Sequence, residues 1–185
     1  MHEVFPDWLR RSMRFIGLIC VVTTVVIPFR YFVAQPFIVS GASMVPTLNP
    51  RDYLVIDRLS DRSQKPERGD VIVFKYPLDP STYFIKRVIG LPGEQVRIEG
   101  GEVRVASTTG EMTLIESYLS SGMNEESVIL LAPDEYFMMG DNREASSDSR
   151  VWGPVKERYL LGRPVLRLFP FNRIEIWPGA VTDAE

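Results

Sequence analysis

Apolar and polar positions alternate along most of the chain after residue 35, and this pattern predicts strands. The runs are rich in β-branched and aromatic residues, and Gly, Pro, Asn and Asp separate them, as is typical of β-strands. Candidate strands lie at 37–41, 53–59, 70–76, 83–91, 95–107, 135–140 and 164–169. Gly100 and Gly101 interrupt one alternating run and predict a compact hairpin turn. The pattern therefore predicts an all-β domain.

The N-terminal part follows a different pattern. Residues 15–29 carry no charge, and with the apolar residues after Arg30 the run approaches the roughly 20 residues that span a bilayer. Arg10, Arg11 and Arg14 precede it, and such a basic cluster favours a cytoplasmic N-terminus. We therefore predict a cytoplasmic segment at 1–14, a transmembrane helix at 15–34 and export of everything that follows.

Two other interpretations of the apolar run are weaker. A cleavable secretory signal has the same basic start and apolar core, but a cut after Ala34 would place Phe32 where a small residue is expected and Pro36 just beyond the cut. A buried core helix would need a helical partner, and the chain beyond residue 36 predicts strands and turns. A retained anchor is favoured over both.

The length of 185 residues allows one globular domain after the anchor, which we place at 35–177. Within it, the stretch from about 95 to 132 is more polar, and it is either an inserted β-region or a long excursion of the main sheet. The tail at 178–185 has little apolar content and is expected to fray.

Composition removes several kinds of chemistry. The net charge of −3 gives no positive field to attract nucleic acid. The single histidine, His2, and the single cysteine, Cys20, have no second residue of their kind for a zinc site or a disulfide, so we expect no metal. A Ser-His-Asp triad fails too, because His2 precedes the membrane segment. A serine enzyme in this chain needs another base.

Two short segments offer a nucleophile and a base. SGASMVPTL, at 40–48, places Ser43 among small residues and gives it a backbone N–H suited to an oxyanion. YFIKRVIG, at 83–90, places Lys86 on a strand face between Phe84 and Val88, where desolvation would lower its pKa. Each segment also fits a plain structure: an ordinary Ser/Gly turn, and an edge-strand lysine whose head reaches water.

A third segment is a polar loop. GDNREASSDSR, at 140–150, gathers acidic residues, arginines and serines after a predicted strand. Taken alone it is a solvated turn with weak surface ion pairs. So many short hydrogen-bonding side chains nevertheless favour a loop fixed by its own polar network, and loops of this kind often position catalytic groups.

These three segments, in this order after one N-terminal anchor, resemble the type I signal peptidases, which cut signal peptides from exported proteins. RGDVIVF at 68–74 and IKRVIGLPGE at 85–94 add to the match, which runs from about residue 12 through WGPV at 152–155 to about residue 171. The resemblance implies an antiparallel β-sheet catalytic domain and a Ser-Lys serine endopeptidase without a cofactor. It also implies the bacterial inner membrane, with the catalytic domain on its outer face.

Carried over by position, the resemblance makes Ser43 the nucleophile and Lys86 the general base, and Ser146 the hydroxyl that helps to orient the lysine amine. It gives supporting roles to Asp141, Asp148 and Arg150, and we hypothesise that Arg87 pairs with Asp141. Residues implied to line shallow substrate pockets for small side chains are Phe37, Val39, Met44 and Ile85. The implied partners are the signal peptides of exported preproteins and the lipid bilayer, and the export machinery is a further candidate. Nucleic acid is not an expected partner.

The chain departs from the family pattern in two places. Some members carry a serine two residues before the nucleophile as a side-chain oxyanion donor, whereas this chain has Gly41. The oxyanion would then depend on backbone N–H groups, chiefly that of Ser43, with Ser40 as a further candidate. Glu144 and Ala145 replace the commoner Asp and Asn, and neither position has an assigned chemical role.

Other functions remain open at this level. A dedicated pilin or conjugation processing peptidase would share the dyad and the anchor. An SOS-repressor-type autoprotease would also share the dyad, but the chain offers neither a DNA-binding domain nor an internal cleavage linker. A non-catalytic, membrane-tethered β-domain that binds exported peptides predicts damage to the dyad, yet Ser43, Lys86 and Ser146 are all present.

Overall fold

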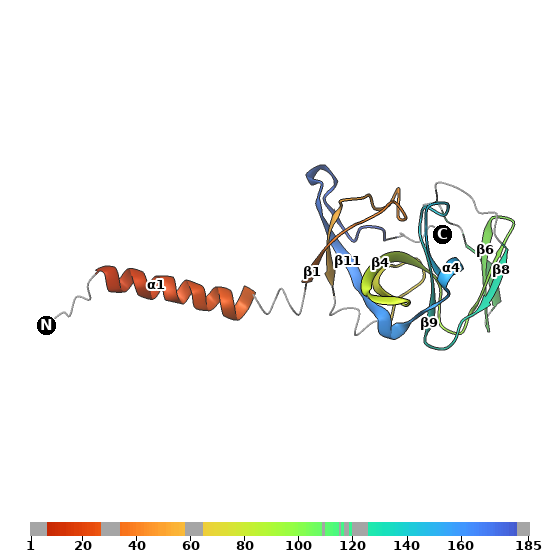
Figure 1. Ribbon diagram of the computed structural model, residues 1–185, viewed down its shortest axis with the longest axis horizontal. Coiled ribbons are helices and arrows are strands. Elements are labelled where there is room, and N and C mark those ends of the chain that lie inside the picture. Colours follow the sequence, from red (N-terminus) through yellow and green to blue (C-terminus); the bar gives the residue numbers. More distant parts are fainter. Residues whose placement is uncertain are drawn as a thin grey trace.

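Strands are the main secondary structure of the computed structural model, in agreement with the alternating pattern (Figure 1). The structure describes residues 7–26, 34–57, 65–108, 110–114, 116, 119 and 126–180. Every pair of neighbouring strands in this part of the chain is antiparallel. The prediction of an all-β, antiparallel domain is therefore confirmed.

The N-terminal part begins with helix α1 (Asp7–Val21), and one π-helical turn, η1 (Val22–Val26), continues it. Helix α1 stands apart from the strands in Figure 1. Among the helices of the described residues, none combines the length and the apolar character needed to cross a membrane. Residues 27–33 of the predicted anchor lie outside the described part of the chain, so the anchor at 15–34 stays a prediction.

One eight-stranded sheet forms the larger part of the domain. Its order is β1 (Ala34–Ile38), β2 (Tyr53–Asp57), β11 (Leu160–Phe169), β3 (Val71–Tyr76), β4 (Asp79–Gly90), β9 (Glu135–Met139) and β10 (Val155–Lys156), with β12 (Glu175–Ile176) paired to β11. Three short helical turns complete the elements, namely α4 (Ser149–Trp152), η2 (Glu157–Tyr159) and η3 (Phe171–Arg173). Strand β1 lies at one edge of this sheet.

Strand β4 positions the residues of most interest. The prediction missed its first residues, 79–82, because they are exposed and give no apolar signal, whereas 86–90 are buried. Because side chains alternate along a strand, Lys86 and Arg87 point to opposite faces. Both side chains are nevertheless buried. Strand β4 therefore buries one basic side chain on each face of the sheet.

The more polar stretch forms a sheet of its own. Strands β5 (Gln95–Glu99), β6 (Glu102–Ser107), β7 (Gly110–Thr113) and β8 (Ser127–Leu130) pair in the order β7-β6-β5-β8. Gly100 and Gly101 make the predicted turn with φ of 60° and 84°, values that favour glycine. The sheet packs on the main body through a cluster that includes Val96, Ile98, Ile89 and Phe137.

The first residues of the expected frayed tail behave otherwise. Pro178 is buried, and the carbonyl of Gly179 accepts a hydrogen bond of 2.6 Å from Arg87 Nη1. A buried guanidinium needs acceptors for its five N–H groups, and the chain end supplies one. Residues 181–185 lie outside the described part of the chain.

Candidate active site

Ser43 lies in a tight turn that follows strand β1. The N–H of Val45 donates to the carbonyl of Ala42 at 3.2 Å, and the N–H of Leu48 donates to that of Met44 at 2.8 Å. Met44 and Leu48 are buried in the core beneath the turn, whereas Ser43 is only partly buried. The apolar residues of this segment therefore fasten the turn and leave the serine hydroxyl accessible.

Lys86 approaches Ser43 from strand β4. Its Nζ lies 2.6 Å from Ser43 Oγ, which is hydrogen-bonding distance. The lysine side chain is buried, and Nζ lies 5.5 Å from the centroid of the Phe84 ring. The structure thus brings together the serine and the lysine that stand 43 residues apart in the sequence.

Burial changes the proton affinity of this lysine. Desolvation lowers the pKa of Lys86 from 10.5 to about 8, although the negative charges of Asp148 and Asp141 act in the opposite direction. About half of the lysine side chains are then neutral at pH 8. A neutral amine at 2.6 Å from a hydroxyl can accept its proton.

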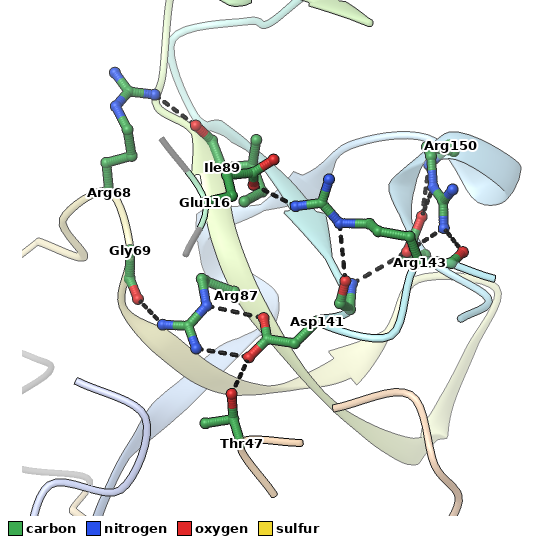
Figure 2. Close-up of polar contacts among 11 residues, drawn as sticks. Thr47, Arg68, Gly69, Arg87, Ile89, Glu116, Asp141, Arg143 and Arg150 are labelled. Atoms are coloured by element: carbon green, nitrogen blue, oxygen red, sulfur yellow. Dashed lines mark hydrogen bonds and ion pairs between the residues drawn. The ribbon is translucent and has the colours of Figure 1, made fainter. Parts of the chain in front are cut away.

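The other face of β4 carries a buried ion pair, shown in Figure 2. Arg87 Nε donates to Asp141 Oδ1 at 2.9 Å, and Arg87 Nη2 donates to Asp141 Oδ2 at 2.6 Å. The pair is thus bidentate, as we hypothesised. The hydroxyl of Thr47 donates to Asp141 at 2.5 Å, and Gly69 accepts from Arg87 at 2.7 Å. Asp141 therefore joins β4, the Ser43 turn and the 140–150 loop.

Replacing Arg87 with Leu is expected to lower the free energy of unfolding by about 3–5 kcal/mol, because it leaves the Asp141 carboxylate buried without its cation. Both side chains of the pair are only 1% exposed. Urea unfolding of the full chain in detergent measures the effect. Arg104→Leu is the matched control, since Arg104 pairs with Glu102 at the surface. A loss below about 1 kcal/mol would contradict the assigned role of the pair.

Asp148 holds the 140–150 loop from within. It accepts hydrogen bonds from the N–H of Gly140 at 3.1 Å and from Arg150 Nε at 2.8 Å. Burial alone would raise the pKa of Asp148, but the Arg150 guanidinium and these hydrogen bonds outweigh it and lower the pKa. Arg150 also donates to the carbonyl of Arg143 at 2.7 Å. The predicted polar network of this loop is present.

Ser146 lies at the inner side of the same loop. A Cβ atom on Gly140 would lie 2.3 Å from Ser146 Oγ and 2.4 Å from the carbonyl oxygen of Ser43, so only glycine fits there. Ser146 Oγ is buried and forms no hydrogen bond of normal geometry with a described residue, although it is close enough to Asp148 to help lower the pKa of that carboxylate. Its orienting effect on Lys86 stays a prediction.

An apolar pocket of about 220 Å³ opens beside the two reactive groups, and Ser43 and Lys86 both line it. Phe37, Val39 and Ile85, three of the four predicted substrate contacts, line it as well. Met44 does not appear in its wall; it is 1% exposed and packs in the core with Val39. The substrate contact of Met44 stays a prediction.

Some residues at this site were not singled out from the sequence. Tyr83 and Ser147 line the pocket, and the Tyr83 ring packs edge-on against Phe37 with centroids 5.5 Å apart. Tyr83 could have been found, since it stands two residues before Ile85 on the same strand face. Glu116, from the chain between β7 and β8, pairs with Arg143 of the 140–150 loop (Figure 2), and no sequence pattern pointed to that contact.

The residues that the structure describes contain no group of three or more His, Cys, Asp and Glu side chains placed as metal ligands would be. The buried carboxylates at the site have other partners, since Asp141 binds Arg87 and Asp148 binds Arg150.

Comparison with known proteins identifies the family of this chain. A family model described as signal peptidase, peptidase S26, matches residues 11–169. The chain belongs to the peptidase S26 family. "Probable signal peptidase I-2" of Synechocystis sp. is 40% identical over 164 residues, which are 85% of this chain and 71% of that protein. "Signal peptidase I" of Leptolyngbya laminosa is 37% identical over 174 residues, covering 90% of this chain and 82% of that one.

A solved structure is also similar. The crystal structure of a signal peptidase I from Enterococcus faecalis V583 is 30% identical, with a TM-score of 0.47, and the match covers 54% of this chain and 97% of that chain. The S26 family match spans the Ser43 turn, strand β4 and the whole 140–150 loop.

Proposed function

We propose that this chain is a membrane-bound serine endopeptidase that removes signal peptides from exported preproteins, with Ser43 as nucleophile and Lys86 as general base. The observation that carries the proposal is the approach of a buried lysine amine to within 2.6 Å of a serine hydroxyl in the wall of an apolar pocket. Membership of the signal peptidase S26 family supports the choice of substrate.

The reaction proceeds in two halves. The neutral amine of Lys86 takes the proton of Ser43 Oγ as this oxygen attacks the scissile carbonyl carbon, and the carbonyl oxygen becomes an oxyanion. The lysine ammonium then gives its proton to the leaving amine, the C–N bond breaks and an acyl-enzyme ester remains. A water molecule attacks the ester, Lys86 accepts its proton, and the return of that proton to Ser43 frees the enzyme.

The substrate is an extended peptide. Strand β1 is an edge strand of the main sheet, so its free side offers backbone groups to a further strand. The pocket beside it is small and apolar, with Phe37, Val39 and Ile85 in its wall. The family resemblance implies small residues such as Ala before the scissile bond, and the apolar wall of this pocket suits their methyl groups.

The proposed location follows from the N-terminal segment. An anchor at 15–34 with a cytoplasmic N-terminus holds the catalytic domain at the outer face of a bacterial inner membrane, where exported preproteins emerge. The lipid bilayer and the preprotein are then the partners, together with the export machinery that delivers the substrate.

Cleavage of a model preprotein by the purified full chain in detergent tests the proposal. We expect one cut at the end of the signal peptide, identified by the mass of the mature product, and no cut when the Ala just before that bond is replaced with Phe. A panel of unrelated preproteins separates a general enzyme from a dedicated one. Binding without cleavage, or a cut that ignores the Phe replacement, would contradict the proposal.

A further inference from the structure

Asn142 contacts the main chain on both sides of the reactive serine. Its side-chain Nδ2 donates to the carbonyl of Ala42 at 3.2 Å, and its backbone N–H donates to the carbonyl of Ser43 at 3.0 Å. Its Oδ1 accepts from the N–H of Ala145 at 3.3 Å. These two side-chain contacts together set the orientation of the amide. A rotated amide would place its oxygen against the Ala42 carbonyl and its NH₂ group against the Ala145 N–H.

The contact with Ala42 determines where the Ser43 N–H points. The carbonyl of Ala42 and the N–H of Ser43 belong to one planar trans peptide unit, so they point in opposite directions. Asn142 Nδ2 and the N–H of Val45 both bind the carbonyl end. The Ser43 N–H is thereby directed away from Asn142, and no described residue accepts a hydrogen bond from it.

The position of Asn142 is fixed by the residue before it in the chain. It follows Asp141, whose carboxylate binds the Arg87 guanidinium and the Thr47 hydroxyl. The buried ion pair thus fixes the main chain next to Asn142. Asn142 in turn holds the peptide between Ala42 and Ser43 through its hydrogen bonds to the two carbonyls. The chain has glycine at position 41, so no side chain there can share the work of binding an oxyanion.

We propose that Asn142 is a positioning residue that orients the Ser43 N–H as the donor to the oxyanion. The inference rests on the proposed function, since an oxyanion forms only if Ser43 attacks a carbonyl. The donor acts on charge that develops during the reaction, so its misorientation slows the chemical step and leaves the binding of uncharged substrate unchanged.

Kinetics of Asn142→Ala with the model preprotein test the inference, alongside Asn142→Asp, which keeps the size of the side chain and its acceptor for Ala145. Removal of one oxyanion donor costs about 100- to 1000-fold, and loss of its orientation should cost less, so we expect kcat to fall about 10- to 100-fold with KM unchanged. Glu144→Gln, on the exposed part of the same loop, is the matched control and should keep wild-type kcat.

A second readout separates positioning from general damage. A peptide aldehyde forms a hemiacetal with Ser43 and places an oxygen in the oxyanion site, whereas the corresponding peptide alcohol does not. Both Asn142 variants should lose about 10- to 100-fold in affinity for the aldehyde and none for the alcohol. In Asn142→Ala, which adds no charge near Lys86, the pH at half-maximal kcat/KM should stay at the wild-type value. If Asn142→Ala does not fold, Asn142→Asp decides.

Three results would overturn the inference: wild-type kcat in both variants, an equal loss of affinity for aldehyde and alcohol, or a displaced pH profile in Asn142→Ala. Failure of the proposed function has a different signature. In that case the wild-type chain itself neither cleaves the preprotein nor binds the aldehyde more tightly than the alcohol, and the inference falls with it.

Discussion

Replacing Ser43 with Ala is expected to lower kcat/KM for a preprotein by at least about 10⁴-fold, because the attacking oxygen is lost and only binding and the oxyanion site remain. The substitution removes the contact of the Ser43 hydroxyl with Lys86 Nζ and leaves the backbone contact of Ser43 with Asn142 in place, so the variant should keep the wild-type fold. A quantitative cleavage assay with purified protein measures the loss, and a tight-binding, uncleaved preprotein complex should accumulate.

Ser107→Ala is the matched control for Ser43→Ala. Ser107 is an exposed serine on β6 of the second sheet, and its replacement should leave cleavage unchanged. If Ser43→Ala retained even a tenth of the wild-type rate, Ser43 would not be the nucleophile.

Replacing Lys86 with Met is expected to lower kcat/KM by about 10⁴-fold as well, since the hydroxyl of Ser43 then has no base. Methionine is unbranched and apolar and fits the space of the buried lysine stem, so the fold should be as stable as the wild type. The loss should appear in kcat, with KM unchanged. Lys65→Met, at a side chain that is 75% exposed, should leave the activity intact.

The double variant sharpens this result. Because Ser43 and Lys86 act as one unit, Ser43→Ala combined with Lys86→Met should lose no more activity than either change alone. Losses that multiply would show that Lys86 contributes independently of Ser43, and would contradict a general-base role.

The sequence predicted most strands of the main sheet from apolar residues that either alternate with polar ones or run continuously. Strand β2 illustrates this, with buried Leu54 and Ile56 between more exposed neighbours. Strand β3 was found as a continuous apolar run. The desolvated environment of Lys86 followed from its neighbours Phe84 and Val88 on the strand.

The sequence did not show which groups meet across the fold. Strand β7 is exposed along its length and gives no alternating signal. The contacts of Glu116 with Arg143 and of Arg87 with Gly179 join residues that are 27 and 92 positions apart. Polar side chains carry no periodic pattern, and their partners are set by the packing of the two sheets. For the same reason, the loop sequence drew attention to the residues around Asn142 without revealing its bond to Ala42.

The second sheet contacts both the main sheet and the 140–150 loop. Its apolar face packs on β4 and β9, and the chain that leaves β7 brings Glu116 to the 140–150 loop. Close approach at Gly90, where a Cβ atom would lie 2.5 Å from Val96, shows how tightly the two sheets meet. The stretch that the sequence marked only as more polar therefore supports the loop that carries Ser146 and Asp148.

The pH dependence of kcat/KM tests most directly the central claim that Lys86 acts as a neutral amine. With a pKa of about 8, only the fraction of enzyme in which this amine is deprotonated can accept the proton of Ser43. We predict that kcat/KM rises about tenfold per pH unit below that value and levels off above it, and that the rise is absent from the residual activity of Lys86→Met. A profile that is flat, or that keeps rising to the ordinary lysine pKa of 10.5, would contradict the account.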